Sequence, residues 1–275
     1  QVVPNYADIP ALALISTLLG LSQEAFLAEK DSPVSEMQCL TVDRAVDRYL
    51  GGEPLPYVLG EWTFYGLDLY VTPDVLIPRD DTCAVAELAI HRGLFLDKGP
   101  RILDLCCGSG CIGIAAAHEV EDARVLAVDL SDGALRLTRE NAHRLGVSGR
   151  LLAMKADATM PPPGGVGPFD IIVSNPPYIT RSEMAQLDHS VADFEPHEAL
   201  YGGVDGLDFY RAICEKWTAA LVPGGRLYFE VGIGQADSVL RLMRAQGFGD
   251  IQVVKDHNDI PRVVFGTLCS EVYSE

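Results

Sequence analysis

Hydrophobic residues near the start of the chain recur at helical spacing, interrupted by short breaks and without a convincing strand. The pattern predicts helices over residues 9–19, 23–28 and 37–50. The Gly-Gly-Glu-Pro sequence at residues 51–54 ends the last of these helices. We therefore expect a small helical domain at residues 1–55.

Residues 56–79 lack the helical spacing of the preceding segment. Apolar and polar positions from Trp62 to Val71 predict a β-hairpin that turns near Gly66. The short segment from Val75 to Arg79 continues as extended chain. We interpret residues 56–79 as a connector between two parts of the molecule.

From residue 80 to 275, apolar runs of strand length alternate with helical segments. The expected strands are residues 101–105, 124–129, 151–156, 169–174, 225–231, 251–255 and 262–267. The expected helices are residues 82–96, 112–118, 131–145, 207–221 and 236–246. This alternation predicts an α/β fold with a mostly parallel sheet and helices on both faces. Ligands of such sheets bind beyond the carboxyl ends of the strands.

Charge and composition narrow the functions that the chain can have. It has 275 residues, and 21 Lys and Arg against 39 Asp and Glu give a net charge of −18. Nucleic-acid binding depends largely on counterion release by basic patches, so we expect no direct nucleic-acid contact. No apolar run approaches the ~20 residues of a membrane span, and the apolar stretch at 11–19 lacks the basic flank of a signal peptide. We expect a cytoplasmic protein that does not bind membranes.

Seven cysteines are present, and three of them lie close together at Cys106, Cys107 and Cys111. No histidine stands at zinc-ligand spacing beside them. We expect no metal site and interpret the cysteines as small buried hydrophobes in a reducing compartment.

A glycine-rich loop follows the first expected strand of the sheet. Gly108, Gly110 and Gly113 also fit the spacing of a dinucleotide-binding loop, so the spacing alone is ambiguous. Asp104 precedes the turn, where it would repel a pyrophosphate but would suit a cationic amino-acid group. The loop then predicts a ligand of that kind, with a purely structural turn as the alternative.

Two further acids stand at strand ends. Asp129 ends the second strand about 20 residues after the loop, at the place of a ribose-binding acid. Its alternative role is to complement the dipole of the following helix. Asp157 follows the third strand and is a candidate for the adenine amino group, with a plain loop acid as the alternative.

The fourth strand ends in Asn175-Pro176-Pro177-Tyr178. The Asn175 side-chain oxygen and the Pro176 carbonyl can accept the two N–H bonds of an amide or aromatic amine. Prolines fix φ and stiffen the direction of the carbonyl, and the Tyr178 ring can lie flat on the captured group. The turn predicts a site that presents an NH2 nitrogen to an electrophile; an ordinary type I turn is the alternative.

Taken in order, these features resemble S-adenosylmethionine-dependent methyltransferases that act on planar NH2 groups. Further segments resemble the HemK/PrmC family over nearly the whole chain; they are residues 56–60, 76–79, 173–179, 194–200, 202–211 and 229–232. The resemblance implies a class I methyltransferase fold with a seven-stranded sheet and a helical domain that recognises a protein substrate. It implies methyl transfer to the side-chain nitrogen (N5) of the glutamine in the Gly-Gly-Gln loop of class 1 peptide chain release factors, by a monomer.

The resemblance also implies roles for individual residues. The catalytic residues would be Asn175, Pro176 and Tyr178. The residues that bind S-adenosylmethionine would be Asp104, Gly108, Ser109, Gly110, Asp129, Asp157 and Asn175. The acceptor amide would lie against Asn175, Pro176, Pro177 and Tyr178. The segment at 180–206 is long and acidic, and could form a lid on the substrate side.

Two departures from the family pattern bear on the choice of substrate. Asp80 replaces a proline in the Pro-Arg-Pro segment, and Cys106 replaces the first glycine of the loop, where backbone approach to the ligand could differ. The cysteine pair is similar to sister enzymes that methylate a glutamine of ribosomal protein L3, whereas residues 202–210 and 255–266 favour the release-factor branch. Methylation of an amino group on a nucleic-acid base, or a non-catalytic role as an adaptor, also stays open at this point.

Overall fold

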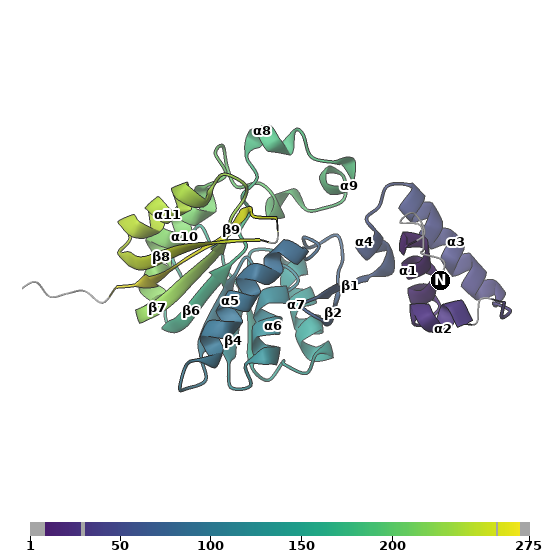
Figure 1. Cartoon of the computed structure of the whole chain (residues 1–275), viewed down its shortest axis with the longest axis horizontal. Coiled ribbons are helices and arrows are strands. Elements are labelled where there is room, and N and C mark those ends of the chain that lie inside the picture. Colours follow the sequence, from purple (N-terminus) through teal and green to yellow (C-terminus); the bar gives the residue numbers. More distant parts are fainter. Residues whose placement is uncertain (1–8, 29–30, 257, 270–275) are drawn as a thin grey trace, which may run out of the picture.

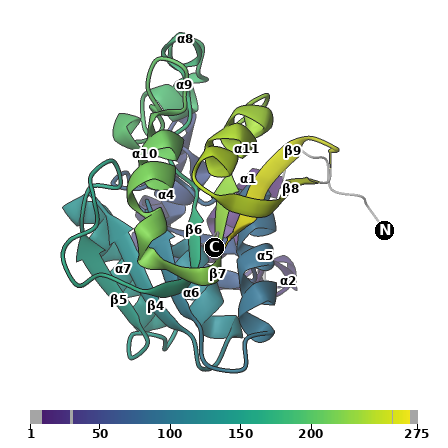
Figure 2. The same ribbon diagram turned by 90° about the vertical axis from the view of Figure 1, so that its left-hand side faces the viewer.

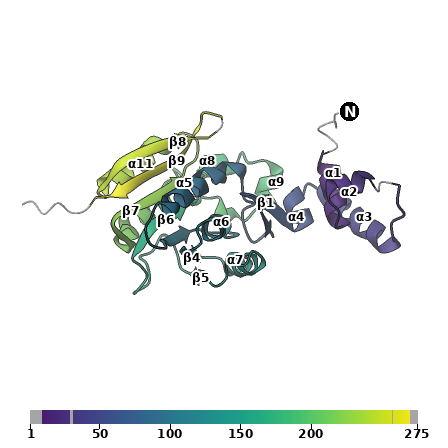
Figure 3. The ribbon, with the colours of Figure 1, turned by 60° about the horizontal axis from the view of Figure 1, so that its bottom comes forward.

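The computed structural model describes residues 9–28, 31–256 and 258–269, and its first three helices form a lobe at one end of the molecule (Figures 1 and 3). These helices are α1 (Ile9–Leu18), α2 (Gln23–Ala28) and α3 (Glu36–Leu50). Ser35 begins α3 with a capping box that includes Gln38. The three predicted helices are present to within one residue at each end.

A short helix and a hairpin connect this lobe to the rest of the chain. They are α4 (Leu55–Leu59), β1 (Glu61–Phe64) and β2 (Leu67–Tyr70). Val58 of α4 packs with residues of α1 and α3, whereas the hairpin packs on the main core. The hairpin was predicted, but α4 was not, because five residues are too few to show helical periodicity.

The main sheet has seven strands in the order β5-β4-β3-β6-β7-β9-β8, and β9 runs antiparallel to the other six strands. The strands are β3 (Arg101–Leu105), β4 (Arg124–Asp129), β5 (Leu151–Lys155), β6 (Phe169–Ser174), β7 (Leu221–Glu230), β8 (Phe248–Lys255) and β9 (Pro261–Leu268). The predicted fold class is confirmed. The chain order reverses direction at β3, between β4 and β6, so a ligand is expected beyond the carboxyl ends of these strands.

Helices cover both faces of the sheet (Figure 2). One face carries α5 (Cys83–Leu94), α6 (Cys111–Glu119) and α7 (Asp132–Arg144). The other face carries α10 (Asp208–Lys216) and α11 (Ala236–Ala245). The predicted helix over 207–221 is too long: its end is the 3₁₀ turn Thr218–Ala220, and the indole N–H of buried Trp217 donates to the Ala158 carbonyl at 3.0 Å.

The long segment that connects β6 to α10 lies above the carboxyl ends of the strands (Figure 1). It contains α8 (Arg181–Met184), α9 (His189–Ala192) and the 3₁₀ turn His197–Ala199. A bridge between Ile179 and Tyr201 brings its two ends together. The segment at 180–206 is therefore a folded cover beside the expected site.

Two predictions from composition concern the cysteines and the membrane. Cys107, Cys111 and Cys214 are buried as expected, but Cys39 and Cys269 are exposed, so the interpretation as buried hydrophobes is wrong for those two. Within the described ranges, every helix is too short or too polar to cross a membrane.

Candidate active site

A cavity opens at the carboxyl ends of β3, β4 and β5, and we call it the β3–β5 cavity. Its floor comes from the loops after these strands, and its other walls come from the connector and from the segment at 180–206. The lining residues include Asp74, Val75, Leu76, Cys106, Gly108, Asp129, Leu130, Ser131, Ala156, Asp157, Ala158, Pro177, Pro196, Glu198, Ala199 and Phe209. The cavity lies where the topology of the sheet predicts a ligand.

Asp129 is held rigidly at the floor of this cavity. Its Oδ2 accepts the Gly108 N–H at 2.9 Å, and its Oδ1 accepts the Ser131 N–H at 2.9 Å. Burial raises the pKa of the Asp129 carboxyl, and these backbone N–H groups oppose the rise. Each carboxylate oxygen keeps a further lone pair, so Asp129 can still accept two hydroxyl groups of a ligand.

The glycine loop gives a ligand room to approach the backbone. Gly108 has φ +54°, and a Cβ atom added there would meet no atom within 4 Å. Cys106 has φ +60°, in the left-handed region that costs a non-glycine residue roughly 1–2 kcal/mol. The backbone thus keeps the left-handed conformation that favours glycine at Cys106, and the thiol side chain borders the cavity.

Three residues predicted to bind the cofactor stand behind the loop and do not line the cavity. Asp104 is fully buried, and its Oδ2 accepts the Gly113 N–H at 2.8 Å. Ser109 is buried, and its carbonyl accepts from the Asn141 amide at 3.0 Å. Gly110 begins α6, with φ +81°. These residues shape the loop, and a direct contact with the cofactor remains a prediction for them.

Asp104 makes the stability of the fold depend on pH, and this dependence can be measured. Burial raises the pKa of its carboxyl from 3.8 to about 7. Ionisation inside the fold is therefore unfavourable, with no penalty below about pH 4 and the full penalty above about pH 7. Asp104→Asn keeps an acceptor for Gly113 and removes the charge, so the variant should gain up to roughly 4 kcal/mol over the wild type between pH 4 and pH 8.

Urea denaturation of both proteins at several pH values measures this difference. Subtracting the two curves cancels every other titrating group that the proteins share. Parallel stability curves for wild type and Asp104→Asn would show that folding does not raise the pKa of Asp104, and would contradict the prediction.

Asp157 also lies in the β3–β5 cavity. Its Oδ1 accepts from the Thr159 N–H at 2.7 Å and from the Thr159 hydroxyl at 2.6 Å. Its second oxygen has no partner of this kind among the described residues. Apolar atoms of Ala156 and Ala158 flank it in the cavity wall. The place fits the predicted contact with an adenine amino group, and that role remains a prediction.

A second cavity, which we call the Asn175 cavity, adjoins the first. Its polar lining consists of Arg79, Asn175, Tyr178 and Glu230, together with Pro176. Its apolar lining consists of Leu76, Ile179, Leu187, Val191, Ala199 and Leu200. Leu76 and Ala199 line both cavities, so the two meet at these side chains.

The Asn-Pro-Pro-Tyr turn separates the two cavities. Asn175, Pro176 and Tyr178 line the Asn175 cavity, whereas Pro177 lines the β3–β5 cavity. The Asn175 Nδ2 donates to the Thr82 hydroxyl at 3.2 Å, and Oδ1 accepts no hydrogen bond from the described residues. One turn therefore lines both cavities.

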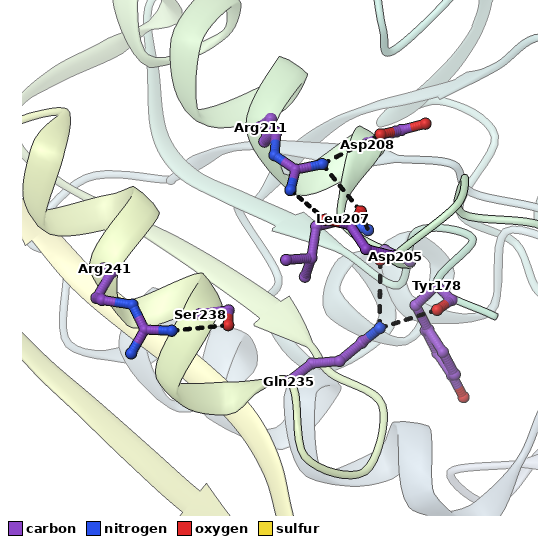
Figure 4. A network of polar contacts seen from close by, with 9 residues as sticks. Tyr178, Asp205, Leu207, Asp208, Arg211, Gln235, Ser238 and Arg241 are labelled. Carbon is purple, nitrogen blue, oxygen red and sulfur yellow. Dashed lines mark hydrogen bonds and ion pairs between the residues drawn. The ribbon is translucent and has the colours of Figure 1, made fainter. Parts of the chain in front are cut away.

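Tyr178 is anchored through its backbone. Gln235 Nε2 donates to the Tyr178 carbonyl at 2.9 Å and to the Gly206 carbonyl at 3.3 Å (Figure 4). Gln235 is itself positioned by the Gly232 N–H, which donates to its Oε1 at 3.1 Å. Burial raises the pKa of the Tyr178 hydroxyl to about 12, so the ring is neutral at physiological pH.

Several residues of the site stand in or beside the segments that resemble the family, and the sequence does not assign them a role. Thr82 and Glu230 are buried next to Asn175, although they come from the start of α5 and the end of β7. Arg79 pairs with Glu195, whose side chain is 1% exposed. This ion pair ties the connector to the segment at 180–206, so Arg79 is a bridging residue.

Comparison with known proteins identifies the class of protein. The model of the Methyltransferase small domain matches residues 90–192. A solved methyltransferase from Pyrococcus furiosus is 17% identical with a TM-score of 0.56, covering 83% of this chain and 100% of that one, and it shares the fold. The chain is a class I S-adenosylmethionine-dependent methyltransferase, and S-adenosylmethionine is its methyl donor.

The relatives then define the family. The model of the PrmC N-terminal domain matches residues 5–60. The release factor glutamine methyltransferase of Geobacter sulfurreducens is 41% identical over 93% of this chain and 87% of the relative. The enzyme of the same name from Bordetella pertussis is 37% identical over 96% of each chain. This chain belongs to the release factor glutamine methyltransferase family, as its sequence motifs indicate.

Proposed function

We propose that this enzyme methylates the side-chain nitrogen of the glutamine in the Gly-Gly-Gln loop of a class 1 peptide chain release factor. The observation that carries the proposal is the position of Asn175, which lines a cavity that adjoins the β3–β5 cavity and whose Nδ2 donates to Thr82. The names of the relatives, release factor glutamine methyltransferases, support the same substrate.

The β3–β5 cavity fits S-adenosylmethionine. Asp129 offers acceptors for the two ribose hydroxyls, and Gly108 leaves open space beside the backbone. Asp157 offers an acceptor for the adenine amino group at the far strand end. When bound, S-adenosylmethionine supplies an electrophilic methyl group on a positively charged sulfur.

The Asn-Pro-Pro-Tyr turn positions the acceptor. An amide nitrogen is a weak nucleophile because its lone pair is delocalised into the carbonyl. The Asn175 side-chain oxygen and the Pro176 carbonyl accept its two N–H bonds, and the Tyr178 ring lies against the amide plane. Such positioning can lower a barrier by up to ~7–11 kcal/mol in well-oriented cases. As the nitrogen gains positive charge, both hydrogen bonds strengthen, which stabilises the transition state. The proton then leaves to water.

The same proposal assigns a role to each of three segments of the chain. Residues 1–55 recognise the protein substrate, residues 56–79 connect, and residues 80–275 carry the methyltransferase site. The first lobe lies at the end of the molecule away from the main sheet (Figure 1), and no described residue of α1, α2 or α3 lines either cavity. On its surface, α3 exposes Met37, Leu40 and Leu50. These side chains suit a polypeptide better than a phosphate backbone. The enzyme then acts as a monomer on a translation factor in the cytoplasm, without binding nucleic acid.

Mapping the methyl group tests the proposal. The enzyme is incubated with labelled S-adenosylmethionine and a release factor, ribosomal protein L3, RNA or DNA in separate reactions. We expect label on the release factor alone. Label on ribosomal protein L3 would assign the chain to that sister branch, and label on RNA or DNA would replace the amide substrate with a nucleobase.

A further inference from the structure

We propose that Glu230 is a further catalytic residue, whose carboxylate takes the proton from the acceptor nitrogen before that proton reaches water. This inference rests on the proposed function, because the proton belongs to the glutamine amide that is methylated. Glu230 is the last residue of β7 and lines the Asn175 cavity. It therefore borders the place proposed for the acceptor nitrogen.

The strand register places Glu230 beside Asn175. In the parallel pair of β6 and β7, Val173 is the partner of Tyr228, and both side chains pack in the same core cluster. Asn175 and Glu230 each follow two residues later. Because side chains alternate between the faces of a sheet, Asn175 and Glu230 share the face of Val173 and Tyr228, at neighbouring strand ends. Both residues line the Asn175 cavity.

One oxygen of Glu230 lacks the partner that a buried polar atom needs. Its Oε2 is buried and has no hydrogen-bond partner among the described residues, and the whole residue is only 2% exposed. A buried acceptor without a partner costs free energy, and the cost is larger for a charged group. Such an atom in a native structure calls for an explanation, and a catalytic role is one. An N–H group of the bound substrate is a partner of the right kind.

The other buried acids with such an oxygen have different surroundings. Among the described residues, Asp104 Oδ1 and Glu195 Oε2 are also buried without a partner. The second oxygen of Asp104 accepts a backbone N–H behind the glycine loop, and the second oxygen of Glu195 pairs with Arg79. Neither acid lines the Asn175 cavity. Of the three, Glu230 is the one placed to meet the acceptor.

The charge of Glu230 is not balanced by the arginine on the adjoining strand. Arg262 of β9 pairs with Asp81 and Asp256, at 3.0 Å each. Burial raises the pKa of the Glu230 carboxyl to about 7, Arg262 and Arg79 lower this pKa, and Asp81 raises it. A carboxyl group with such a pKa can take up and release a proton at neutral pH.

Other titratable groups lie near Glu230 on several elements, and they stay neutral. They are Cys83 of α5, Cys111 of α6, Tyr178 after β6 and Tyr210 of α10. Burial raises the pKa of each of these thiols and hydroxyls above its usual value. Tyr210 also donates to the backbone carbonyl of Glu230 at 2.9 Å. In this set, Glu230 is the group that gains or loses a proton near pH 7.

Proton transfer to Glu230 accompanies methyl transfer. The amide nitrogen uses its lone pair to bind the methyl carbon, and the carbon–sulfur bond breaks with its electrons left on sulfur. The nitrogen then holds two protons and a positive charge. One proton passes to the Glu230 carboxylate, which leaves a neutral N-methyl amide and a neutral carboxylic acid. Glu230 releases that proton to water when the product leaves.

Single-turnover methylation of a release factor, at saturating S-adenosylmethionine, tests the proposal between about pH 5.5 and pH 8.5. The wild-type rate should rise with pH and level off above about pH 7, because only the ionised carboxylate accepts a proton. Glu230→Gln keeps the size of the side chain without a base. Its rate should lie about 10²-fold or more below the wild-type plateau, the usual contribution of a general base, and should lack the rise with pH.

Two variants are the controls for this experiment. Glu230→Asp keeps a carboxylate and should keep the rise with pH at a lower plateau. Glu215→Gln makes the same change at an exposed position of α10 and should retain the wild-type profile. Asp104 also titrates near pH 7 but is present in every variant, so it cannot explain a difference between the profiles.

Two further measurements separate catalysis from general damage. Affinity for S-adenosylmethionine, measured by calorimetry, should stay within about threefold of wild type in Glu230→Gln, because Glu230 does not line the β3–β5 cavity. Thermal melting of each variant reports whether the fold is intact.

The outcomes are distinguishable. A rise with pH that persists in Glu230→Gln would overturn the role of Glu230 as the base, whatever the loss of rate. A plateau rate within about threefold of wild type, or equal losses of rate and cofactor affinity, would overturn it as well. A wild-type enzyme that leaves every release factor unmethylated would instead overturn the proposed function.

Discussion

Replacing Asn175 by alanine is expected to lower turnover by about 10²–10³-fold, the usual effect of removing one preorganised partner from a transition state. The variant loses the side-chain acceptor of Asn175, a residue that lines the Asn175 cavity, while Asp129 and Gly108 in the neighbouring cavity are untouched. Affinity for S-adenosylmethionine should therefore stay within about threefold of wild type. Single-turnover methylation and calorimetric titration of the same preparations measure the two quantities.

Asn175→Asp is the matched variant for this prediction. A carboxylate still accepts N–H bonds, but it adds a negative charge beside the positively charged sulfur of the methyl donor. It also places a second acceptor against Thr82, where Asn175 Nδ2 now donates. We expect turnover between those of Asn175→Ala and wild type. Wild-type turnover in either variant would show that Asn175 does not hold the acceptor.

Replacing Asp129 by alanine is expected to weaken S-adenosylmethionine binding by about 10–150-fold, corresponding to ~1.5–3 kcal/mol for hydrogen bonds to a charged group. The change removes the acceptor proposed for the ribose hydroxyls. It also frees the Gly108 and Ser131 N–H groups that Asp129 now holds. The loss should appear in cofactor affinity, measured by calorimetry without any acceptor present.

Asp132→Ala provides the control. Asp132 lies three residues further along the chain, begins α7 and pairs with Lys155, but its side chain is 80% exposed and lies outside the cavity. Its removal should leave cofactor affinity unchanged. Unchanged affinity in Asp129→Ala as well would remove Asp129 from the cofactor site.

Much of the fold could be predicted because the core strands are continuous apolar runs. The strands at 101–105, 124–129 and 169–174 have the predicted bounds, since each is buried on both faces and bounded by polar or turn residues. The predicted bounds were wrong where tertiary contacts determine the end of an element. The helix predicted over 207–221 ends early because Trp217 turns into the core and Leu221 already joins β7.

The candidate site was predicted in part, and strand alternation explains the difference. Asp129 is the last residue of β4 and reaches the cavity. Asp104 lies one residue before the end of β3, on the same side as Ile102, and this side packs against α6. The spacing of acids at strand ends placed both residues at the correct edge of the sheet. It did not indicate which side chain faces a ligand.

The spacing of residues in the sequence does not indicate that Thr82 and Glu230 lie beside Asn175. Thr82 lies 93 residues before Asn175 in the chain, and only the packing of α5 against the sheet brings its hydroxyl within 3.2 Å of Nδ2. Glu230 ends β7, whose place beside β6 follows from strand order rather than from a local motif. Such contacts depend on the three-dimensional arrangement of segments that are distant in sequence.

The position of the transferred methyl group within a release factor tests the central claim most directly. The enzyme is incubated with labelled S-adenosylmethionine and a release factor, and the digested product is sequenced by mass spectrometry. The same reaction is run on a release factor whose Gly-Gly-Gln glutamine is replaced by glutamate, which has no N–H bond for Asn175 and Pro176 to accept. The account predicts one methyl group on that glutamine nitrogen and none on the glutamate protein. A methyl group elsewhere, or equal labelling of both proteins, would contradict it.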